Sequence, residues 1–217
     1  MAYGNCGQKK CLVLADVGDN VENRKDITFV FIEEQEVFPT KVTPLRMVTA
    51  KYPDHAHNVE GVAMHPNGNI YILTKAIDYE NNRVTAAKVF LLTKKQWQKS
   101  KLSPIELKYI GAIDLSFHLY NFNLFGRIVT GLDIHQSGTK ILISTYKAAI
   151  EIELDLSLNR IQNTRSLEMG KNMVVILLKP LLQIEAISYL DAKSFIYTTE
   201  YHEQYGSSPL VKVECLD

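Results

Sequence analysis

Acidic, amide and basic side chains gather near the start of the chain in a pattern that suits ion binding. The segment LADVGDNVENR (residues 14–24) places Asp16, Asp19, Asn20 and Arg24 directly after an apolar run. Carboxylate and amide oxygens are ligands for a hard cation such as Ca²⁺, whereas a guanidinium suits an anion. The same residue types also cap turns, because short polar side chains accept hydrogen bonds from nearby backbone N–H groups. The segment therefore indicates a metal site, an anion site or, as is more common for such residues, a turn.

Two histidines are a second candidate. His55 and His57 stand two residues apart in YPDHAH (residues 52–57), and imidazole nitrogens ligate metals such as zinc. Histidines in loops are more commonly only solvated, so both interpretations stay open. The sequence has no Gly-rich phosphate loop, no GxSxG, no HExxH and no zinc-type cysteine pair. None of the enzyme classes that these motifs define is therefore indicated.

Composition limits the classes of partner. Of 217 residues 46% are hydrophobic, enough for one full core, and 24 basic residues balance 24 acidic ones. Without a net charge to attract phosphates, nucleic acid is not an expected partner. The longest apolar run, MVVILLKPLL (residues 173–182), is about half as long as a membrane helix and contains Lys179 and Pro180. We expect no membrane span, and the first ten residues show no secretory signal pattern.

Cys6 and Cys11 flank GQKK, which is typical of the loop of a tight β-hairpin. A disulfide between them would mark an oxidising compartment, although it would remove little chain entropy from the unfolded state. The alternative is that two small apolar residues merely flank a turn. Cys215 is then left over.

An internal repeat decides the expected fold. Four segments share an apolar-alternating strand, a turn rich in Gly, Asn, Asp or Lys, and a second strand that ends in polar residues. They are MAYGNCGQKKCLVLAD, EGVAMHPNGNIYILTK, TGLDIHQSGTKILISTY and EAISYLDAKSFIYTTE. Three copies are followed by a third and a fourth strand, and the last reaches only its third, PLVKVEC. Such units predict an all-β fold, a β-propeller of four-stranded antiparallel blades, rather than a sandwich, which does not require a repeated hairpin.

The predicted propeller is a single domain over residues 1–217, with blades at about 1–53, 58–115, 128–178 and 183–217. Its innermost strands should contain Val62, Met64, Leu132, Ile134, Ile187 and Tyr189. Residues 93–101 (TKKQWQKSK) have the pattern of a short helix. The aromatic run FHLYNFNLF (residues 117–125) would form a wall above the channel or pack a loop onto the blades.

The repeat also predicts where polar side chains meet. Because a hairpin reverses direction, each innermost strand starts on the face where the second strand ends. The residues expected around one mouth of the central channel are Asp16, Asp19, Asn20, Arg24, His55, His57, Glu60, Lys75, Thr130, Tyr146, Glu185, Glu200 and His202. Propellers commonly place ligands there, on loops held by a rigid scaffold. The alternative for Glu60 and Glu185 is a structural bond to the backbone of the neighbouring blade.

Several segments match known landmarks in order. They are LADVGDNVENR, YPDHAHNVEGVAMHPNGNIYILTK, IVTGLDIHQSGTKILISTY, QIEAISYL and TTEYHEQYGSSPLVKV. The set resembles a family of largely uncharacterised bacterial β-propeller proteins, mostly exported, which are similar in look to phytase-like and gluconolactonase-like propellers. The resemblance covers nearly the whole chain and implies a periplasmic or extracellular location.

Two departures from the family pattern modify these expectations. Met1 and Ala2 fall where the family has the last residues of W-E-D-[IM]-A, which implies a chain shortened by about one blade of about five. A gap with exposed strand edges is then expected between the last and first blades, and a closed four-bladed ring is the alternative. Ser144 replaces the family's usual Arg before Thr-Tyr, which weakens an anion site there.

Two functional classes follow. The first is a binding or interaction propeller whose acidic mouth holds a small polar molecule, a sugar, or a peptide or protein. The second is a hydrolase, phytase-like or lactonase- or esterase-like, in which Asp19, Glu60 and Glu185 hold Ca²⁺ and the cation polarises an ester or phosphate. The first is favoured, because the calcium site would also need a carboxylate from the family's preceding blade.

Overall fold

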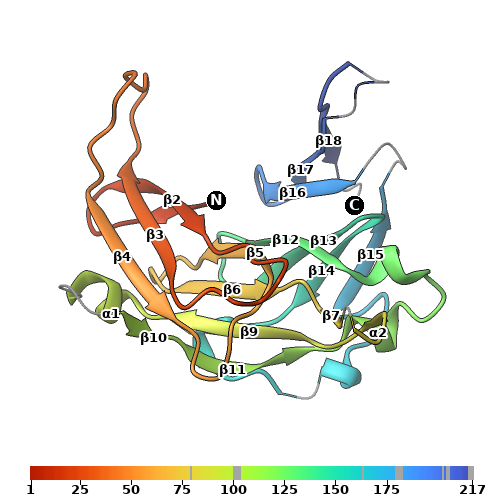
Figure 1. The fold of residues 1–217 in the computed structure, drawn as a ribbon. Helices are drawn as coiled ribbons and strands as arrows, with labels where there is room; N and C mark the ends of the chain where they lie inside the picture. Colours follow the sequence, from red (N-terminus) through yellow and green to blue (C-terminus); the bar gives the residue numbers. More distant parts are fainter. Residues whose placement is uncertain are drawn as a thin grey trace.

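The repeated hairpins form the four blades of a β-propeller, as the sequence predicts (Figure 1). The structure is a computed structural model that describes residues 1–78, 80–99, 104–162, 164–178, 183–201, 203 and 206–214. His202 and Cys215 lie outside the described residues. No helix in these ranges is long and apolar enough to cross a membrane.

The strands of each blade run outward from the channel in chain order. Blade 1 consists of β1 (Ala2–Asn5), β2 (Lys10–Asp16), β3 (Ile27–Glu33) and β4 (Arg46–Lys51). Blade 2 consists of β5 (Val59–Met64), β6 (Ile70–Thr74), β9 (Ala87–Leu92) and β11 (Lys108–Ile113). Blade 3 consists of β12 (Val129–Ile134), β13 (Lys140–Thr145), β14 (Ala148–Glu153) and β15 (Met173–Leu177). Blade 4 consists of β16 (Ile184–Tyr189), β17 (Ser194–Thr199) and β18 (Leu210–Glu214), so all six predicted inner-strand residues lie on β5, β12 or β16.

Short elements lie in the loops. They are β7 (Ile77–Asp78), β8 (Arg83–Val84), β10 (Ile105–Glu106), α1 (Lys94–Lys99), α2 (Leu115–His118) and 3-10 turns at Leu124–Arg127, Leu156–Leu158 and Thr164–Ser166. The helix α1 lies within the segment predicted as a short helix, and Thr93 and Gln96 form a reciprocal cap at its start. Thr93 Oγ1 accepts from the Gln96 backbone N–H at 3.2 Å, and Gln96 Oε1 accepts from the Thr93 N–H at 2.9 Å.

Apolar residues on both faces of the strands hold neighbouring blades together. The strand β6 is buried throughout: Ile70 and Ile72 pack toward blade 1, whereas Tyr71 and Leu73 pack toward blade 3. Successive side chains of a strand point to opposite faces, so one continuous apolar run serves two interfaces. A third cluster, which includes Leu142 and Phe195, joins blade 3 to blade 4. The core therefore lies between blades rather than in a single centre.

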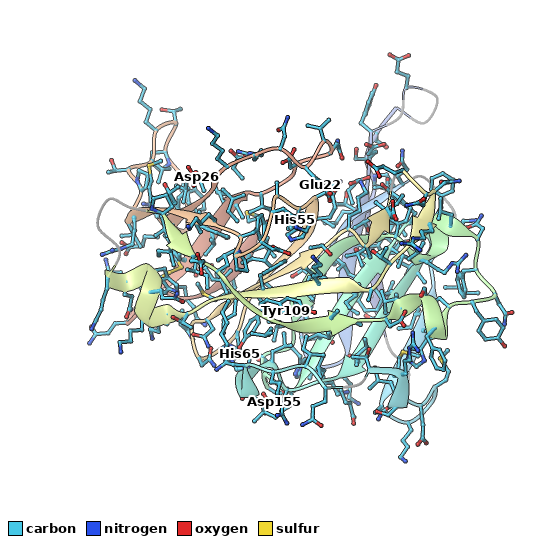
Figure 2. The ribbon with its side chains drawn as sticks, turned by 60° about the horizontal axis from the view of Figure 1, so that its bottom comes forward. Glu22, Asp26, His55, His65, Tyr109 and Asp155 are labelled. Atoms are coloured by element: carbon cyan, nitrogen blue, oxygen red, sulfur yellow. A yellow bond between two sulfur atoms is a disulfide. The ribbon has the colours of Figure 1, made fainter. Side chains whose placement is uncertain are left out.

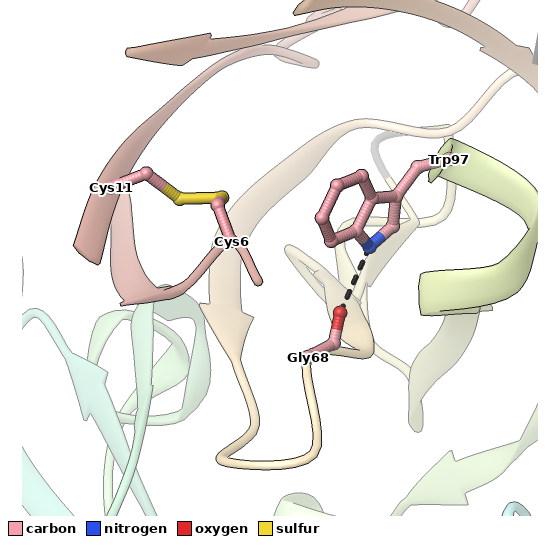
Figure 3. Close-up of a disulfide and its surroundings, with 4 residues drawn as sticks. All are labelled: Cys6, Cys11, Gly68 and Trp97. Atoms are coloured by element: carbon pink, nitrogen blue, oxygen red, sulfur yellow. Dashed lines mark hydrogen bonds between the residues drawn. A yellow bond between two sulfur atoms is a disulfide. The ribbon is translucent and has the colours of Figure 1, made fainter. Parts of the chain in front are cut away.

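The indole of Trp97 on α1 belongs to the interface between blades 1 and 2. It stacks on Phe31 with ring centroids 4.6 Å apart, and its Nε1–H donates to the carbonyl oxygen of Gly68 at 2.9 Å (Figure 3). Figure 3 also shows the disulfide between Cys6 and Cys11, which closes the first hairpin.

The segment before β11 pairs with blade 1, although the predicted blade bounds assign it to blade 2. Ile105 and Glu106, in β10, pair in parallel with Ala50 and Lys51 on the outer edge of blade 1. The fourth strand of blade 2 therefore begins only at Lys108. The reason is that β4 has an open edge whose backbone groups accept a further strand.

The innermost strands form a series around the channel. The strand β5 packs against β1 and β12, and β12 packs against β16. Blades 1 and 4 face each other across a cavity of about 660 Å³, lined by residues of β1 and β16 such as Ala2, Gly4, Ile187 and Tyr189. The ends of the series thus meet at a cavity, whereas the other neighbouring blades share apolar clusters.

Candidate functional site

Three β-bulges lie at one mouth of the central channel. In each of β5, β12 and β16, one extra residue interrupts the regular pairing with the next strand. The extra residues are Glu60, Thr130 and Glu185 respectively. A bulge leaves its extra residue out of the regular ladder and re-aims the side chain. The same irregularity thus recurs at the same position in three blades, but Thr130 is buried and its hydroxyl donates to Ser144 Oγ at 3.0 Å.

Each bulge is followed by a small residue. A Cβ atom added to Gly61 would lie 2.8 Å from Leu132 Cβ of the next blade, and one added to Gly131 would lie 2.7 Å from Ser144 Oγ. Ala186 follows the third bulge. Gly61 therefore lets β5 and β12 approach closely beside the mouth, whereas Gly131 leaves room for Ser144 of its own blade.

The residues that follow the second strands of the same blades complete the arrangement. Lys75, Tyr146 and Glu200 come directly after β6, β13 and β17. Lys75 Nζ lies 2.9 Å from Glu60 Oε1 and 5.9 Å from the ring centroid of Tyr146. Gln183 Nε2 donates to Glu200 Oε2 at 3.0 Å. We call these residues and Glu185 the channel-mouth set: Glu60, Lys75, Tyr146, Glu185 and Glu200.

The channel-mouth set contains a carboxyl group whose charge changes near neutral pH. Burial, together with the negative charges of Glu200 and Glu60, raises the pKa of Glu185 to about 7, although Lys75 opposes the shift. Burial would lower the pKa of Lys75, but its bond to Glu60 raises it above its usual value. Burial raises the pKa of Tyr146. The mouth thus combines the ion pair of Lys75 and Glu60, the phenol of Tyr146, and two further carboxyls, of which Glu185 has its pKa raised to about 7.

The aromatic run of residues 117–125 packs a loop onto the blades, which is one of its two predicted roles. Leu119 is buried in the core between blades 2 and 3, and Phe122 packs against that core. Phe125 is 55% exposed, and its ring lies edge-on to Tyr146 at a centroid distance of 6.0 Å. One residue of the run therefore extends the channel-mouth set on its apolar side.

The polar residues of the first-blade loop (residues 16–24) bond to one another. Arg24 Nη1 and Nη2 donate to the two carboxylate oxygens of Asp16 at 2.7 and 2.6 Å, and the Arg24 backbone N–H donates to Asp19 Oδ2 at 2.7 Å. The buried Asn58 accepts from the Asp19 N–H at 3.3 Å and donates to Asn20 Oδ1 at 3.0 Å. These bonds fit the interpretation of the segment as a turn, anchored on blade 2.

The loop before β5 carries a separate cluster. His57 Nε2 lies 2.9 Å from Asp54 Oδ1, and His55 Nδ1 lies 3.4 Å from Asp54 Oδ2. Burial opposes the charge on Asp54, but hydrogen bonds from His57 and Lys88 hold its pKa below the usual value. Burial lowers the pKa of His57, against the opposite effect of Asp54.

A cavity of about 480 Å³ connects this cluster with the channel mouth. Glu22, His55 and His57 line one part of it and Lys75 lines another; Glu22 and His55 are labelled in Figure 2. The predicted mouth residues therefore divide into three groups that adjoin this cavity or the channel.

The proposed calcium ligands are distributed over these groups. Glu60 and Glu185 interact electrostatically, but Asp19 is held in the first-blade loop by Arg24. Among the described residues, the cluster whose ligand atoms lie within 4.8 Å of one another is Asp54, His55 and His57, and it does not include those three carboxylates. Calcium binding itself stays a prediction.

Sequence reasoning missed several residues of these groups. It did not single out Asp54 or Lys88, whose side chains complete the histidine cluster, nor Asn58, which ties two blades together. Asp54 and His57 stand three residues apart, and that spacing was the available signal. Lys88 lies on β9 and offers no signal in sequence, because its proximity depends on strand pairing.

Comparisons with known proteins leave the family open. No family model matches the sequence, and no curated protein matches it. Among solved structures, a PQQ-bound aldose sugar dehydrogenase from Streptomyces coelicolor has a TM-score of 0.44 at 9% identity, covering 96% of this chain and 80% of that one. A hemopexin fold protein, CP4 from cow pea, has a TM-score of 0.41 at 7% identity, covering 98% and 92%. Similarity at this level says nothing about ligand or activity.

Proposed function

We propose that this β-propeller is a binding or interaction protein that holds a small polar ligand, such as a sugar or a short peptide, at the channel-mouth set. The observation that supports this most is Glu185, a carboxyl with a pKa of about 7 on a bulge between Glu60 and Glu200. A binding site is a common reason for such a perturbed group at a channel mouth. A purely structural ion-pair network would also perturb the pKa of a carboxyl. Such a network would not require an exposed aromatic ring beside it, which Phe125 supplies.

The chemistry of the mouth favours a ligand with hydroxyl or amine groups beside an apolar face. Glu60 is already paired with Lys75, whereas Glu185 and Glu200 leave a surplus of negative charge when both are ionised. Carboxylates accept hydrogen bonds from two neighbouring hydroxyls or from an ammonium group. The exposed ring of Phe125, which lies against Tyr146, offers an apolar surface near them. Nucleic acid is not proposed as a partner, since the net charge is zero.

The test is a thermal-shift screen of the full chain with monosaccharides, oligosaccharides and short peptides at about pH 6 and about pH 8, since a ligand at about 100 times its Kd stabilises the fold by about 3 kcal/mol. A positive ligand should lose affinity in Glu185→Gln and in Tyr146→Ala. Glu153→Gln, an exposed carboxylate at the end of β14, is the matched control and should bind normally. A ligand whose affinity is unchanged by both mouth variants would refute the proposed site.

The calcium-dependent hydrolase is tested in the same screen. A rise in melting temperature with millimolar Ca²⁺ that is lost in Glu60→Gln would favour the hydrolase over the binding protein.

We also propose that this propeller is exported to a periplasmic or extracellular location, as its resemblance to the bacterial family implies. The disulfide between Cys6 and Cys11 supports this location, because such bonds persist in oxidising compartments. Thiol labelling of the protein isolated from its source would test it.

A further inference from the structure

Three potential metal ligands come from one short segment between blades 1 and 2. Asp54, His55 and His57 each offer one ligand atom, a carboxylate oxygen or an imidazole nitrogen, and these three atoms lie within 4.8 Å of one another. Ligands around a tetrahedral zinc ion, each about 2.0–2.1 Å from the metal, are separated by little more than 3 Å. Asp54 Oδ1 lies 2.9 Å from His57 Nε2 and Asp54 Oδ2 lies 3.4 Å from His55 Nδ1, so each imidazole is about as far from one carboxylate oxygen as neighbouring ligands of such an ion are.

The deepest ligand of the three is held rigidly. The side chain of His57 is 6% exposed, and its ring packs against Tyr52 and Phe90 at centroid distances of 5.0 Å each. The next residue, Asn58, is bonded to the first-blade loop. A ligand fixed by packing loses little freedom when it binds a metal. His55, in contrast, is exposed and can adjust.

The cavity provides room for a further ligand. His55 and His57 both line the cavity of about 480 Å³ that extends to Lys75, so a metal bound to them would lie at its wall. Metal sites with three protein ligands commonly keep one position for water or a bound molecule. A dedicated structural site, closed by four protein ligands, would not border a cavity of this size.

From these observations we propose that Asp54, His55 and His57 bind a divalent transition metal, with zinc as the expected ion, and leave one coordination position open to the cavity. Two imidazoles and one carboxylate suit Zn²⁺, whereas Ca²⁺ takes six to eight oxygen ligands. The proposal does not depend on the ligand of the channel-mouth set.

Lys88 is the competitor at this site. Its Nζ lies 3.0 Å from Asp54 Oδ2, where it neutralises the carboxylate that the metal would use. The Lys88 side chain is 36% exposed and can turn into solvent when a cation binds. The two cations therefore exclude each other at Asp54, and the removal of Lys88 should strengthen metal binding.

The experiment titrates the full chain, stripped with a chelator, with Co²⁺ followed by its visible absorption and with Zn²⁺ followed by calorimetry. One metal per chain is expected, and His55→Ala and Asp54→Asn should each weaken binding by about tenfold or more. His118→Asn is the matched control, because His118 bonds to the Thr164 carbonyl oxygen on another part of the molecule. Lys88→Gln should bind Zn²⁺ more tightly than the wild type.

Two results would overturn the proposal. The first is a wild-type affinity no tighter than that of His55→Ala, which would mean that the metal binds elsewhere or weakly at the surface. The second is an equal loss in His118→Asn, which would indicate a general effect of removing a histidine. Thermal melting without metal checks that each variant is folded, and His55 is the diagnostic position because its side chain is 62% exposed.

Discussion

Replacing Glu185 by Gln should stabilise the protein above neutral pH and leave it unchanged in acid. The carboxyl has a pKa of about 7 in the fold against 4.5 in an unperturbed chain, so the folded state keeps a proton that the unfolded chain has lost. Unfolding then releases a proton, and the free energy of unfolding falls as pH rises from 4.5 to about 7. Below this window both states are protonated, and above it the loss is complete. Gln carries no charge at any pH, so the variant does not lose this part of the free energy of unfolding as pH rises.

The size of the effect follows from the shift. A change of about 2.5 pKa units corresponds to about 3 kcal/mol if it is fully expressed. Glu185 is only half-buried, so solvent screening reduces this to about 1–2 kcal/mol. For a chain of this length the melting temperature should rise by about 3–6 °C at about pH 8 and by nothing at about pH 4.

The assay is thermal melting of wild type, Glu185→Gln and the control Glu153→Gln across this range. Equal melting temperatures for wild type and Glu185→Gln at high pH would refute the reasoning, since burial beside Glu60 and Glu200 would then not strain the ionised carboxyl. A stabilisation that also appears in Glu153→Gln would point to net charge instead.

Three further substitutions test packing and hydrogen bonds by chemical denaturation. Asn58→Ala should cost about 2 kcal/mol, because it removes two hydrogen bonds to the first-blade loop, one buried and one partly buried; no loss would show that the loop is anchored otherwise. Gly61→Ala should cost about 1–3 kcal/mol, because the new Cβ meets Leu132 Cβ at 2.8 Å, and a neutral result would mean that the blades separate easily. Trp97→Phe should cost about 1–2 kcal/mol through the lost bond to Gly68, unless water replaces the indole.

The sequence predicts the architecture well because the signal is local and repeated. Alternating apolar residues and turn types mark each hairpin, and α1 carries its own capping residues at Thr93 and Gln96. The departure of β10 could not be predicted, because the pairing of Glu106 with Lys51 joins segments that are distant in the chain. Apolar pattern alone does not distinguish one sheet edge from another.

The candidate site could be predicted only in outline. The directions of the strands bring Glu60, Lys75 and Glu185 to one mouth, and this prediction requires no knowledge of atomic positions. The bulges that aim the glutamates were not predictable, since a single extra residue leaves the apolar alternation on either side intact. The bond between His57 and Asp54 depends on the path of an irregular loop, which carries no periodic signal.

The short parallel strand β10 has a further consequence for how the propeller opens. It joins the rim of blade 1 to the chain of blade 2 through the Leu107 N–H, which donates to the Lys51 carbonyl oxygen at 2.9 Å, while the apolar cluster joins the same blades further in. Two attachments at different radii resist a hinge motion that either one alone would allow. Blades 1 and 2 should therefore unfold as one cooperative unit, and the amide hydrogens of β4 and β9 should exchange with solvent through a shared opening, at a common rate.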